Sequence, residues 1–135
     1  MTLKDISKDN ESKPKRIVLI DDEPGVILAL KLLLQVHGFI VEAFSDPLVG
    51  LEFITNNAPA LSSNSIDYIL CDLRMPKKTG MQILMETRGI AGHIPFYLMS
   101  GHAEEAEQQK AIAEGAAGFL SKPFSPEDFL QLIGR

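Results

Sequence analysis

The chain has 135 residues, of which 45% are hydrophobic and 23% are charged, and its net charge at neutral pH is −5. This size and composition predict one compact domain with a sizeable core and leave no room for a second domain. The negative charge argues against direct nucleic-acid binding by this domain, because sequence-independent binding depends on Lys and Arg meeting phosphates.

The sequence gives no indication of membrane insertion or export. Its longest apolar stretch, residues 26–34, is interrupted by Lys31 and is far shorter than the roughly 20 residues needed to cross a bilayer. The polar N-terminus lacks the apolar segment of a signal peptide. Cys71 is the single cysteine, which excludes an internal disulfide. We therefore expect a cytoplasmic protein without membrane contact, with Cys71 packed in the core.

Residues 1–14 mix Lys, Asp, Ser, Asn and Glu with few apolar side chains and end at Pro14, which is typical of a flexible polar tail. From Lys15 to Arg135 we expect the folded domain. There, short apolar runs alternate with longer amphipathic segments, the pattern of repeated βα units around a parallel sheet.

Five apolar runs are predicted strands. All but the second are nearly continuous, as expected of parallel strands covered on both faces, whereas the second alternates and suits a sheet edge. The predicted strands are Ile17–Ile20, Phe39–Phe44, Ile66–Cys71, Ile94–Met99 and Ala117–Leu120.

Five amphipathic segments between and after these strands are predicted helices. Gly38 is suited to end the first, and Ser125 with Pro126 to begin the last. Residues 58–65 are predicted to form a surface loop. The predicted helices are Gly25–His37, Asp46–Asn57, Gly80–Arg88, Ala103–Glu114 and Pro126–Ile133.

Polar side chains that could bind a ligand or take part in a reaction follow four of the five strands. In a doubly wound sheet the carboxyl ends of parallel strands meet at one edge, where ligands bind. Each residue alone could be a helix cap or a solvated side chain, but packing explains none of them and the topology would bring them together. They are Asp21, Asp22 and Glu23 after the first strand, Asp72 after the third, Ser100 after the fourth, and Lys122 after the fifth.

The clustered acids predict a cation site. Two carboxylates about 4 Å apart repel by roughly 4 kcal/mol at an effective dielectric near 20, so a bound cation would relieve them. An all-oxygen site favours Mg²⁺, with Mn²⁺ as the other candidate, and the three histidines have no spacing that suggests zinc. Carboxylates, a metal ion, a hydroxyl and an amine together indicate a phosphoryl-binding site.

The motifs at these strand ends resemble the receiver domains of two-component response regulators. The resemblance extends from about residue 15 to residue 135, and its motifs occur in order at successive strand ends. It implies a flavodoxin-like (βα)₅ fold with a five-stranded parallel sheet in the order 2-1-3-4-5, the order that chemotaxis receivers share. The matching segments are Asp21-Asp22-Glu23-Pro24, Asp72-Leu73-Arg74-Met75-Pro76, Met99-Ser100-Gly101-His102 and Lys122-Pro123-Phe124.

The resemblance also implies a role for each residue. Asp72 corresponds to the phosphoacceptor, and Asp21, Asp22, Asp72 and the backbone carbonyl of Arg74 correspond to the ligands of Mg²⁺. Ser100 corresponds to the hydroxyl of the conformational switch, Phe119 to its aromatic residue and Lys122 to the lysine that pairs with the phosphate. Two positions depart from common family choices, since Ser100 stands where Thr is at least as usual and Phe119 lacks a tyrosine hydroxyl.

The expected function is therefore that of a stoichiometric phosphoacceptor and not of an enzyme. A histidine kinase or a histidine phosphotransfer protein would supply the phosphoryl group, with self-phosphorylation from small phosphodonors and autodephosphorylation as accompanying reactions. The last helix looks short for the family, which is consistent with a receiver cut from a longer protein, so an output domain or a downstream protein is the expected target. The resemblance further predicts a cis bond between Lys122 and Pro123.

Three other functions stay open at the level of sequence. A phosphatase that turns over through a phospho-Asp, such as a haloacid-dehalogenase-type enzyme, would commonly place a second Asp two residues after the nucleophile, where this chain has Arg74. A flavin-binding module would need a phosphate-cradling loop, for which there is no convincing candidate. A phosphorylation-independent pseudo-receiver is disfavoured by the intact set of acids, Ser100 and Lys122.

Overall fold

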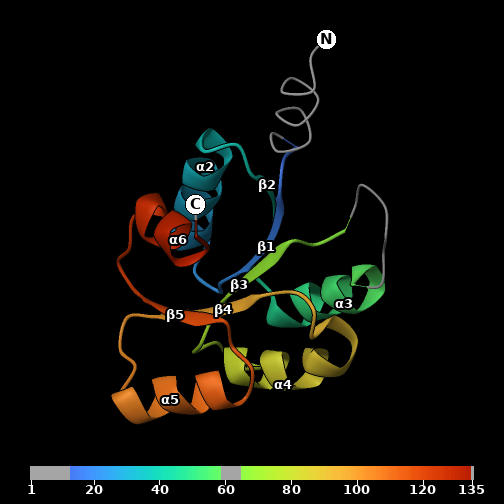
Figure 1. Ribbon diagram of the computed structural model, residues 1–135, viewed down its shortest axis with the longest axis vertical. Coiled ribbons are helices and arrows are strands. Elements are labelled where there is room, and N and C mark those ends of the chain that lie inside the picture. The colour runs from blue at the N-terminus through green and yellow to red at the C-terminus, as the bar shows by residue number, and fades with distance from the viewer. Residues whose placement is uncertain (1–12, 59–64, 135) are drawn as a thin grey trace.

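The computed structural model describes residues 13–58 and 65–134, in which five strands alternate with five helices (Figure 1). In chain order the elements are β1 (Arg16–Ile20), α2 (Pro24–Val36), β2 (Ile40–Phe44), α3 (Pro47–Asn57), β3 (Tyr68–Asp72), α4 (Gly80–Ala91), β4 (Phe96–Ser100), α5 (Glu105–Ala113), β5 (Gly118–Ser121) and α6 (Pro126–Leu132).

The strands form one parallel sheet in the order β2-β1-β3-β4-β5. This confirms the predicted fold class and strand order, including the edge position of the second strand. Strand β1 pairs with both β2 and β3, so β2 lies on one side of β1 and the later strands lie on the other side. The loops after β1 and β3 therefore face one another, which creates the topological switch point where ligands bind in such sheets.

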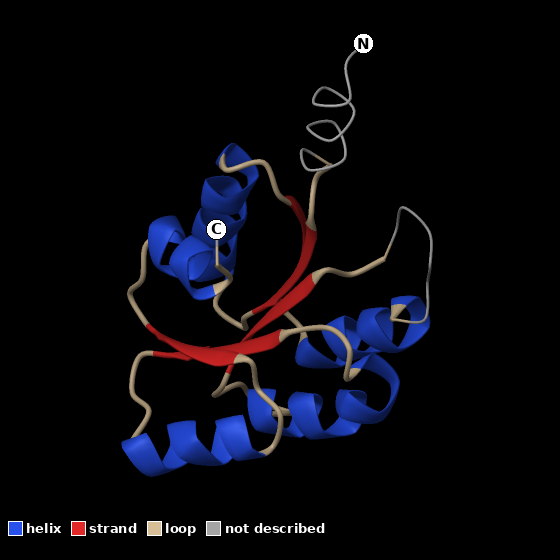
Figure 2. Ribbon diagram, in the orientation of Figure 1, coloured by secondary structure: helices blue, strands red, loops and turns tan. Residues whose placement is uncertain are grey.

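Helices cover both faces of the sheet, which makes it doubly wound (Figure 2). The helices α2 and α6 lie on one face, and α3, α4 and α5 lie on the other (Figure 1). Each face has its own cluster of buried apolar side chains. This arrangement explains why the central strands are apolar along their whole length, since both faces of each strand are buried.

Phe129 of α6 anchors the smaller helical layer. Its side chain is fully buried, and its ring packs edge-on against Tyr97 and Tyr68, with centroid distances of 5.6 and 6.0 Å. Phe39 completes the group at 6.1 Å. The short helix α6 is thus held by aromatic contacts to the sheet, and a capping box between Ser125 and Asp128 fixes its first turn as the sequence predicted.

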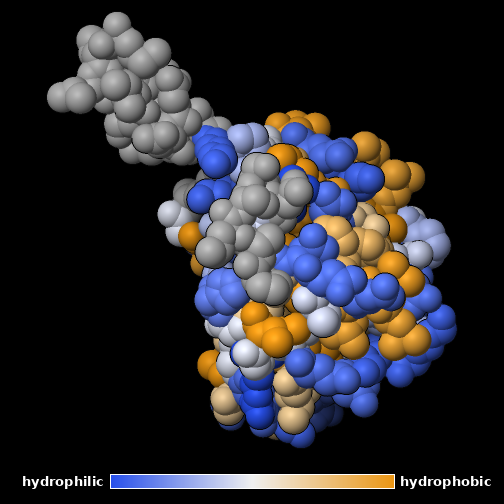
Figure 3. All heavy atoms as spheres, turned by 90° about the vertical axis from the view of Figure 1, so that its right-hand side faces the viewer, coloured by the Kyte–Doolittle hydropathy of each residue, from blue (hydrophilic) through white to orange (hydrophobic). Residues whose placement is uncertain are grey.

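On the side where α3 lies, hydrophobic and hydrophilic residues are interspersed (Figure 3). Within residues 13–58 and 65–134, every helix is too short or too polar to span a bilayer.

The predicted strands are displaced from the observed ones by one or two residues. Ile66 and Ile94 are buried but lie before β3 and β4, whereas Asp72 and Ser100 end these strands instead of following them. The reason is that apolar side chains report burial, while strand assignment depends on backbone hydrogen bonds. The backbone of Leu73 still continues the ladder, with its N–H donating to the carbonyl of Met99 at 2.8 Å.

Helix boundaries show smaller corrections. The third helix continues to Ala91, three residues past its predicted end, because Gly89 is tolerated within it. The fourth begins at Glu105 and not at Ala103, with Glu104 as its N-cap, whose backbone N–H donates to Oε1 of Glu107 at 3.2 Å. The conformation predicted for residues 1–12 and most of that for the loop at 58–65 lie outside the described residues.

We predict that Phe129→Ala lowers the free energy of unfolding by about 3–5 kcal/mol, because it removes a fully buried ring and leaves a cavity. Leu48→Ala is the control, since Leu48 is 45% exposed and should change stability by much less. Urea unfolding followed by circular dichroism measures both values. A loss below about 1 kcal/mol for Phe129→Ala would contradict the assigned packing of α6.

Candidate functional site

The carboxyl ends of β1, β3, β4 and β5 bring the predicted polar residues to one edge of the sheet. Asp21 directly follows β1, Asp72 ends β3, Ser100 ends β4 and Lys122 directly follows β5. The register places Asp72 beside Met99 and Ser100 beside Ser121 across neighbouring strands. The prediction that these residues share one edge is confirmed.

Three carboxylates form the centre of the site. Oxygens of Asp21, Asp22 and Asp72 all lie within 4.8 Å of one another, and no other such cluster of acidic, His or Cys side chains occurs in the described part of the chain. Asp21 and Asp72 are buried, while Asp22 is half-buried. Three carboxylates that offer only oxygen ligands fit a hard divalent cation such as Mg²⁺.

Asp21 is held in place by backbone contacts at the end of β1. Its N–H donates to the Phe44 carbonyl at 3.1 Å, which extends the β1–β2 ladder by one residue. Its Oδ1 accepts the N–H of Glu23 at 3.0 Å. The side chain is therefore fixed before any ligand arrives.

Lys122 lies between two of the acids. Its Nζ is 2.6 Å from Oδ2 of Asp21 and 3.2 Å from Oδ1 of Asp72. The backbone N–H of Lys122 donates to the Ser100 carbonyl at 2.8 Å, which ties the lysine to β4. The following bond to Pro123 is cis, as the resemblance predicted.

Burial and neighbouring charge change the protonation behaviour of this group. Burial, followed by repulsion from Asp21, raises the pKa of Asp72 to about 6, although Lys122 opposes the shift. Burial alone would lower the pKa of Lys122, but its hydrogen bond to Asp21 and the charges of both acids outweigh burial and raise the pKa above its ordinary value. Lys122 thus stays charged, and Asp72 is largely ionised at neutral pH.

The predicted switch residues lie on the β4 and β5 side of the site. Ser100 is buried, and its hydroxyl oxygen accepts the N–H of His102 at 3.1 Å. Phe119 is half-buried; it packs against the core beneath α5 and lines a groove beside Ile112. Among the nine residues of α5, all of them described, only Ala111 is buried. Little apolar contact therefore holds this helix to the sheet.

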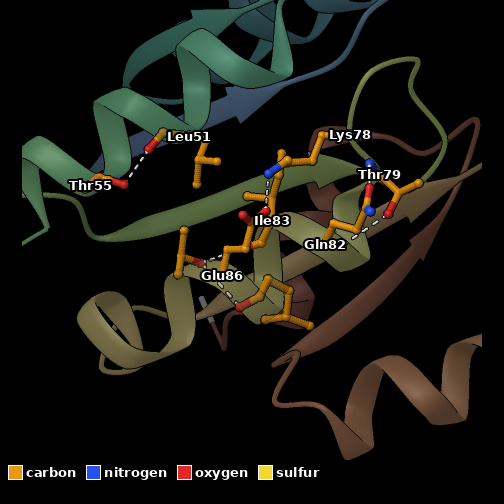
Figure 4. Close-up of polar contacts among 9 residues, drawn as sticks. Leu51, Thr55, Lys78, Thr79, Gln82, Ile83 and Glu86 are labelled. Carbon is orange, nitrogen blue, oxygen red and sulfur yellow. Dashed lines mark hydrogen bonds and ion pairs between the residues drawn. The ribbon is translucent and has the colours of Figure 1, made fainter.

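The loop after β3 is built by local hydrogen bonds. Thr79 and Gln82 form a capping box at the start of α4, and Lys78 pairs with Glu86 one turn further along (Figure 4). A Cβ at Gly80 would collide with the carbonyl oxygen of Asp72 and lie 2.6 Å from Leu98 Cδ2. Glycine at this position lets α4 begin directly against the residue that carries the central carboxylate.

Sequence reasoning missed the contacts of the Arg74 side chain. Its Nη2 donates to Oε1 of Glu107 at 2.5 Å and to the carbonyl of His102 at 3.1 Å. The guanidinium therefore joins the loop after β3 to the loop after Ser100 and to the first turn of α5. Glu107 is 33 residues from Arg74 in the chain, so no local pattern could have indicated this pair.

The sequence of residues 17–134 matches the response regulator receiver domain family. Together with the sheet order and the acidic cluster, this match shows that the chain belongs to that family, as the resemblance indicated. It is a receiver domain of the two-component response regulators.

Individual relatives agree with this assignment. The response regulator protein TodT of Pseudomonas putida is 32% identical over 117 residues, which cover 87% of this chain and 48% of TodT. A receiver domain protein from Clostridium thermocellum superposes with a TM-score of 0.80 at 34% identity, covering 88% of this chain and 90% of that one. The chemotaxis protein CheY4 of Vibrio cholerae gives 0.77 at 25% identity, with 89% and 96% covered. The chain thus spans about half the length of TodT.

We predict that the burial of Asp72 makes stability depend on pH in the metal-free protein. The pKa of this carboxyl is about 6 in the folded protein and near 3.9 in an unfolded chain. The folded state holds the proton more tightly, so the stability that the protonated group contributes is fully present below about pH 4 and is lost as the pH rises through 6.

Accordingly, Asp72→Asn should raise the free energy of unfolding by about 2 kcal/mol at pH 7.5, and by less than half of that below about pH 4.5. Urea unfolding in the presence of a chelator, repeated across this pH range, measures the difference. If the difference in unfolding free energy between Asp72→Asn and the wild type does not change with pH, ionisation of Asp72 does not destabilise the folded protein.

Proposed function

We propose that this domain accepts a phosphoryl group on the carboxylate of Asp72 from a phosphohistidine of a histidine kinase or a histidine phosphotransfer protein. The observation that carries the proposal is the contact of Asp72 with the Lys122 ammonium, 3.2 Å away, within a cluster of two further acids. Of the three acids, Asp72 alone ends the central strand β3 and has acids from the β1 end as neighbours.

The chemistry is a transfer between two nucleophiles. An oxygen of Asp72 attacks phosphorus, the bond between phosphorus and the donor imidazole breaks, and its electron pair returns to the imidazole nitrogen. Lys122 stabilises negative charge on the phosphoryl oxygens from its position beside Asp72. Asp21, Asp22, Asp72 and the carbonyl of Arg74 would hold Mg²⁺, with Mn²⁺ as a substitute, and the ion would neutralise charge on the acids and the phosphoryl group.

The arrangement supports a stoichiometric acceptor over a phosphatase. A phosphatase of the competing type would need a proton donor two residues after Asp72, and that residue is Arg74, whose guanidinium does not give up its proton in proteins. Arg74 is also engaged by Glu107 and the His102 carbonyl. Self-phosphorylation from small phosphodonors and slow loss of the phosphoryl group belong to the same proposal.

The wider setting follows from the family. Response regulators such as TodT are about twice as long as the matched region, so we assign the response to an output domain or to a separate downstream protein. The domain itself would act in the cytoplasm and would bind neither nucleic acid nor membrane directly.

We predict that a small phosphodonor with Mg²⁺ adds one phosphoryl group to the wild-type chain, detected by intact-mass spectrometry. Asp72→Ala should abolish the modification, and Asp22→Ala should slow it at least about tenfold because a metal-binding acid is lost. Glu23→Gln is the matched control, since Glu23 is an exposed acid beside Asp22 that lies outside the cluster. Persistent Mg²⁺-dependent labelling of Asp72→Ala would remove Asp72 from the mechanism.

The switch would connect Asp72 to the surface formed by α5, β5 and α6. Phosphoryl oxygens would draw in the Ser100 hydroxyl, which now accepts the N–H of His102. The half-buried Phe119 would then turn inward into the vacated space, and α5, which is pinned by little buried area, would shift. The result is a changed partner surface.

The hydrogen bond of Ser100 alone cannot supply the free energy that the conformational change needs. A population change from 1:99 to 99:1 needs about 5.5 kcal/mol of differential binding, whereas one neutral hydroxyl hydrogen bond is worth about 0.5–1.5 kcal/mol. Lys122 and the bound cation must therefore supply part of the bias.

We predict that beryllofluoride with Mg²⁺ shifts the NMR signals of α5 and Phe119 in the wild type, and that Ser100→Ala reduces these shifts. The reduction is expected because the alanine has no hydroxyl for the ligand to draw in. Signals of Asp22, at the other side of the site, report ligand binding in both proteins. Equal responses of α5 and Phe119 in both proteins would exclude Ser100 as the coupling residue.

A further inference from the structure

Helix α5 is attached to the domain by an arginine–glutamate ion pair at each of its ends. At the first turn, Nη2 of Arg74 lies 2.5 Å from Oε1 of Glu107. At the other end, Nη1 of Arg88, on the neighbouring helix α4 (Figure 1), lies 2.6 Å from Oε2 of Glu114, the C-cap residue of α5. Because Ala111 alone is buried among the nine described residues of the helix, these polar contacts fix much of its position.

The Glu107 carboxylate also has a partner within its own helix. Oε1, the oxygen that faces Arg74, accepts the backbone N–H of Glu104 at 3.2 Å. Glu104 is the N-cap residue, so this bond belongs to the capping box that fixes the first turn of α5. Arg74 therefore holds an ordered helix end, and not a mobile side chain alone.

The same guanidinium holds the loop that follows β4. Nη2 of Arg74 donates to the carbonyl of His102 at 3.1 Å, and the N–H of His102 donates to the Ser100 hydroxyl at 3.1 Å. His102 is thus bonded on one side to Ser100 and on the other to Arg74. Ser100, His102, Arg74 and Glu107 form one continuous series of polar contacts, which we call the Arg74 latch.

The backbone that carries Arg74 continues the sheet. The N–H of the preceding residue, Leu73, donates to the carbonyl of Met99 at 2.8 Å and so extends the β3–β4 ladder. A displacement of α5 or of the loop at His102 relative to this ladder therefore disturbs the contacts of the guanidinium. The proposed response to phosphorylation requires such a displacement, since the Ser100 hydroxyl leaves the His102 N–H and α5 shifts. The latch therefore favours the unphosphorylated arrangement.

We propose that the Arg74 latch is an autoinhibitory contact, which stabilises the unphosphorylated arrangement of α5 and of the loop at His102 and thereby weakens the binding of a phosphoryl group at Asp72. The inference rests on the proposed function of Asp72 and adds a regulatory element to it. A contact that is present in one state and lost in the other shifts the equilibrium between the states, and the linkage is reciprocal. Loss of the latch therefore strengthens ligand binding.

NMR titration with beryllofluoride at saturating Mg²⁺ measures the effect, because this ligand imitates a phosphoryl group on the carboxylate of Asp72. We expect Arg74→Met and Glu107→Gln each to bind it about two- to fivefold more tightly than the wild-type chain does. The expected change is modest because the ion pair is exposed to solvent, with the side chains of Arg74 and Glu107 at 56% and 36% exposure.

The two substitutions separate the latch from a simple effect of charge. Loss of a cation near the site weakens the binding of an anion, and loss of an acid strengthens it, so electrostatics alone predicts opposite changes for Arg74→Met and Glu107→Gln. The latch predicts tighter binding for both variants. The double variant should bind about as tightly as either single variant, because each substitution breaks the same contact.

Arg88→Met is the matched control, since it breaks the ion pair at the opposite end of the same helix. It should leave the affinity for beryllofluoride unchanged. Hydrogen exchange without ligand checks that each substitution acts where expected. Amides of residues 103–108 should exchange faster in Arg74→Met and Glu107→Gln, and amides close to Glu114 should exchange faster in Arg88→Met.

Three results would overturn the latch while leaving the phosphorylation of Asp72 intact. They are equal affinity of the wild type and both latch variants, opposite changes in Arg74→Met and Glu107→Gln, and an equal gain of affinity in Arg88→Met. The last result would show that any loosening of α5 suffices. A wild type that binds no beryllofluoride would contradict the proposed function itself, and the latch with it.

Discussion

The ammonium of Lys122 between Asp21 and Asp72 is the contact on which the arrangement of the site depends. Two carboxylates at such separations repel by several kcal/mol at an effective dielectric near 20, and both are buried here. Lys122 compensates one negative charge at 2.6 and 3.2 Å. With Asp22 included, three acids face one lysine, so the cluster retains an excess of negative charge that a divalent cation would balance.

The fold positions these charges by extending its own hydrogen-bonded ladders. The backbone of Asp21 continues the pairing of β1 with β2, and the backbone of Lys122 bonds to Ser100 at the end of β4. Asp72 is the last residue of the central strand, and Gly80 allows α4 to begin against its carbonyl. The site is therefore a direct continuation of the sheet, and its geometry is fixed largely by the backbones of the residues whose side chains carry the chemistry.

Sequence patterns predicted much of this because they report the constraints that dominate the fold. Continuous apolar runs identified buried parallel strands, and polar residues at their ends identified the site. Strand limits were displaced at Ile66 and Ile94, since burial extends beyond the hydrogen-bonded ladder. The pairing of Arg74 with Glu107 was not predictable, because contacts between side chains far apart in the chain depend on rotamers and loop paths that no local pattern encodes.

We infer that the three acids form a cation site whose negative charge Lys122 balances only in part. Calorimetric titration with Mg²⁺ tests it most directly, comparing wild type, Asp22→Asn and the control Glu23→Gln. We expect one Mg²⁺ per wild-type chain, at least about tenfold weaker binding for Asp22→Asn, and unchanged binding for Glu23→Gln. The inference would be wrong if the Asp22→Asn variant bound Mg²⁺ as tightly as the wild type. It would also be wrong if Glu23→Gln weakened Mg²⁺ binding as much as Asp22→Asn does.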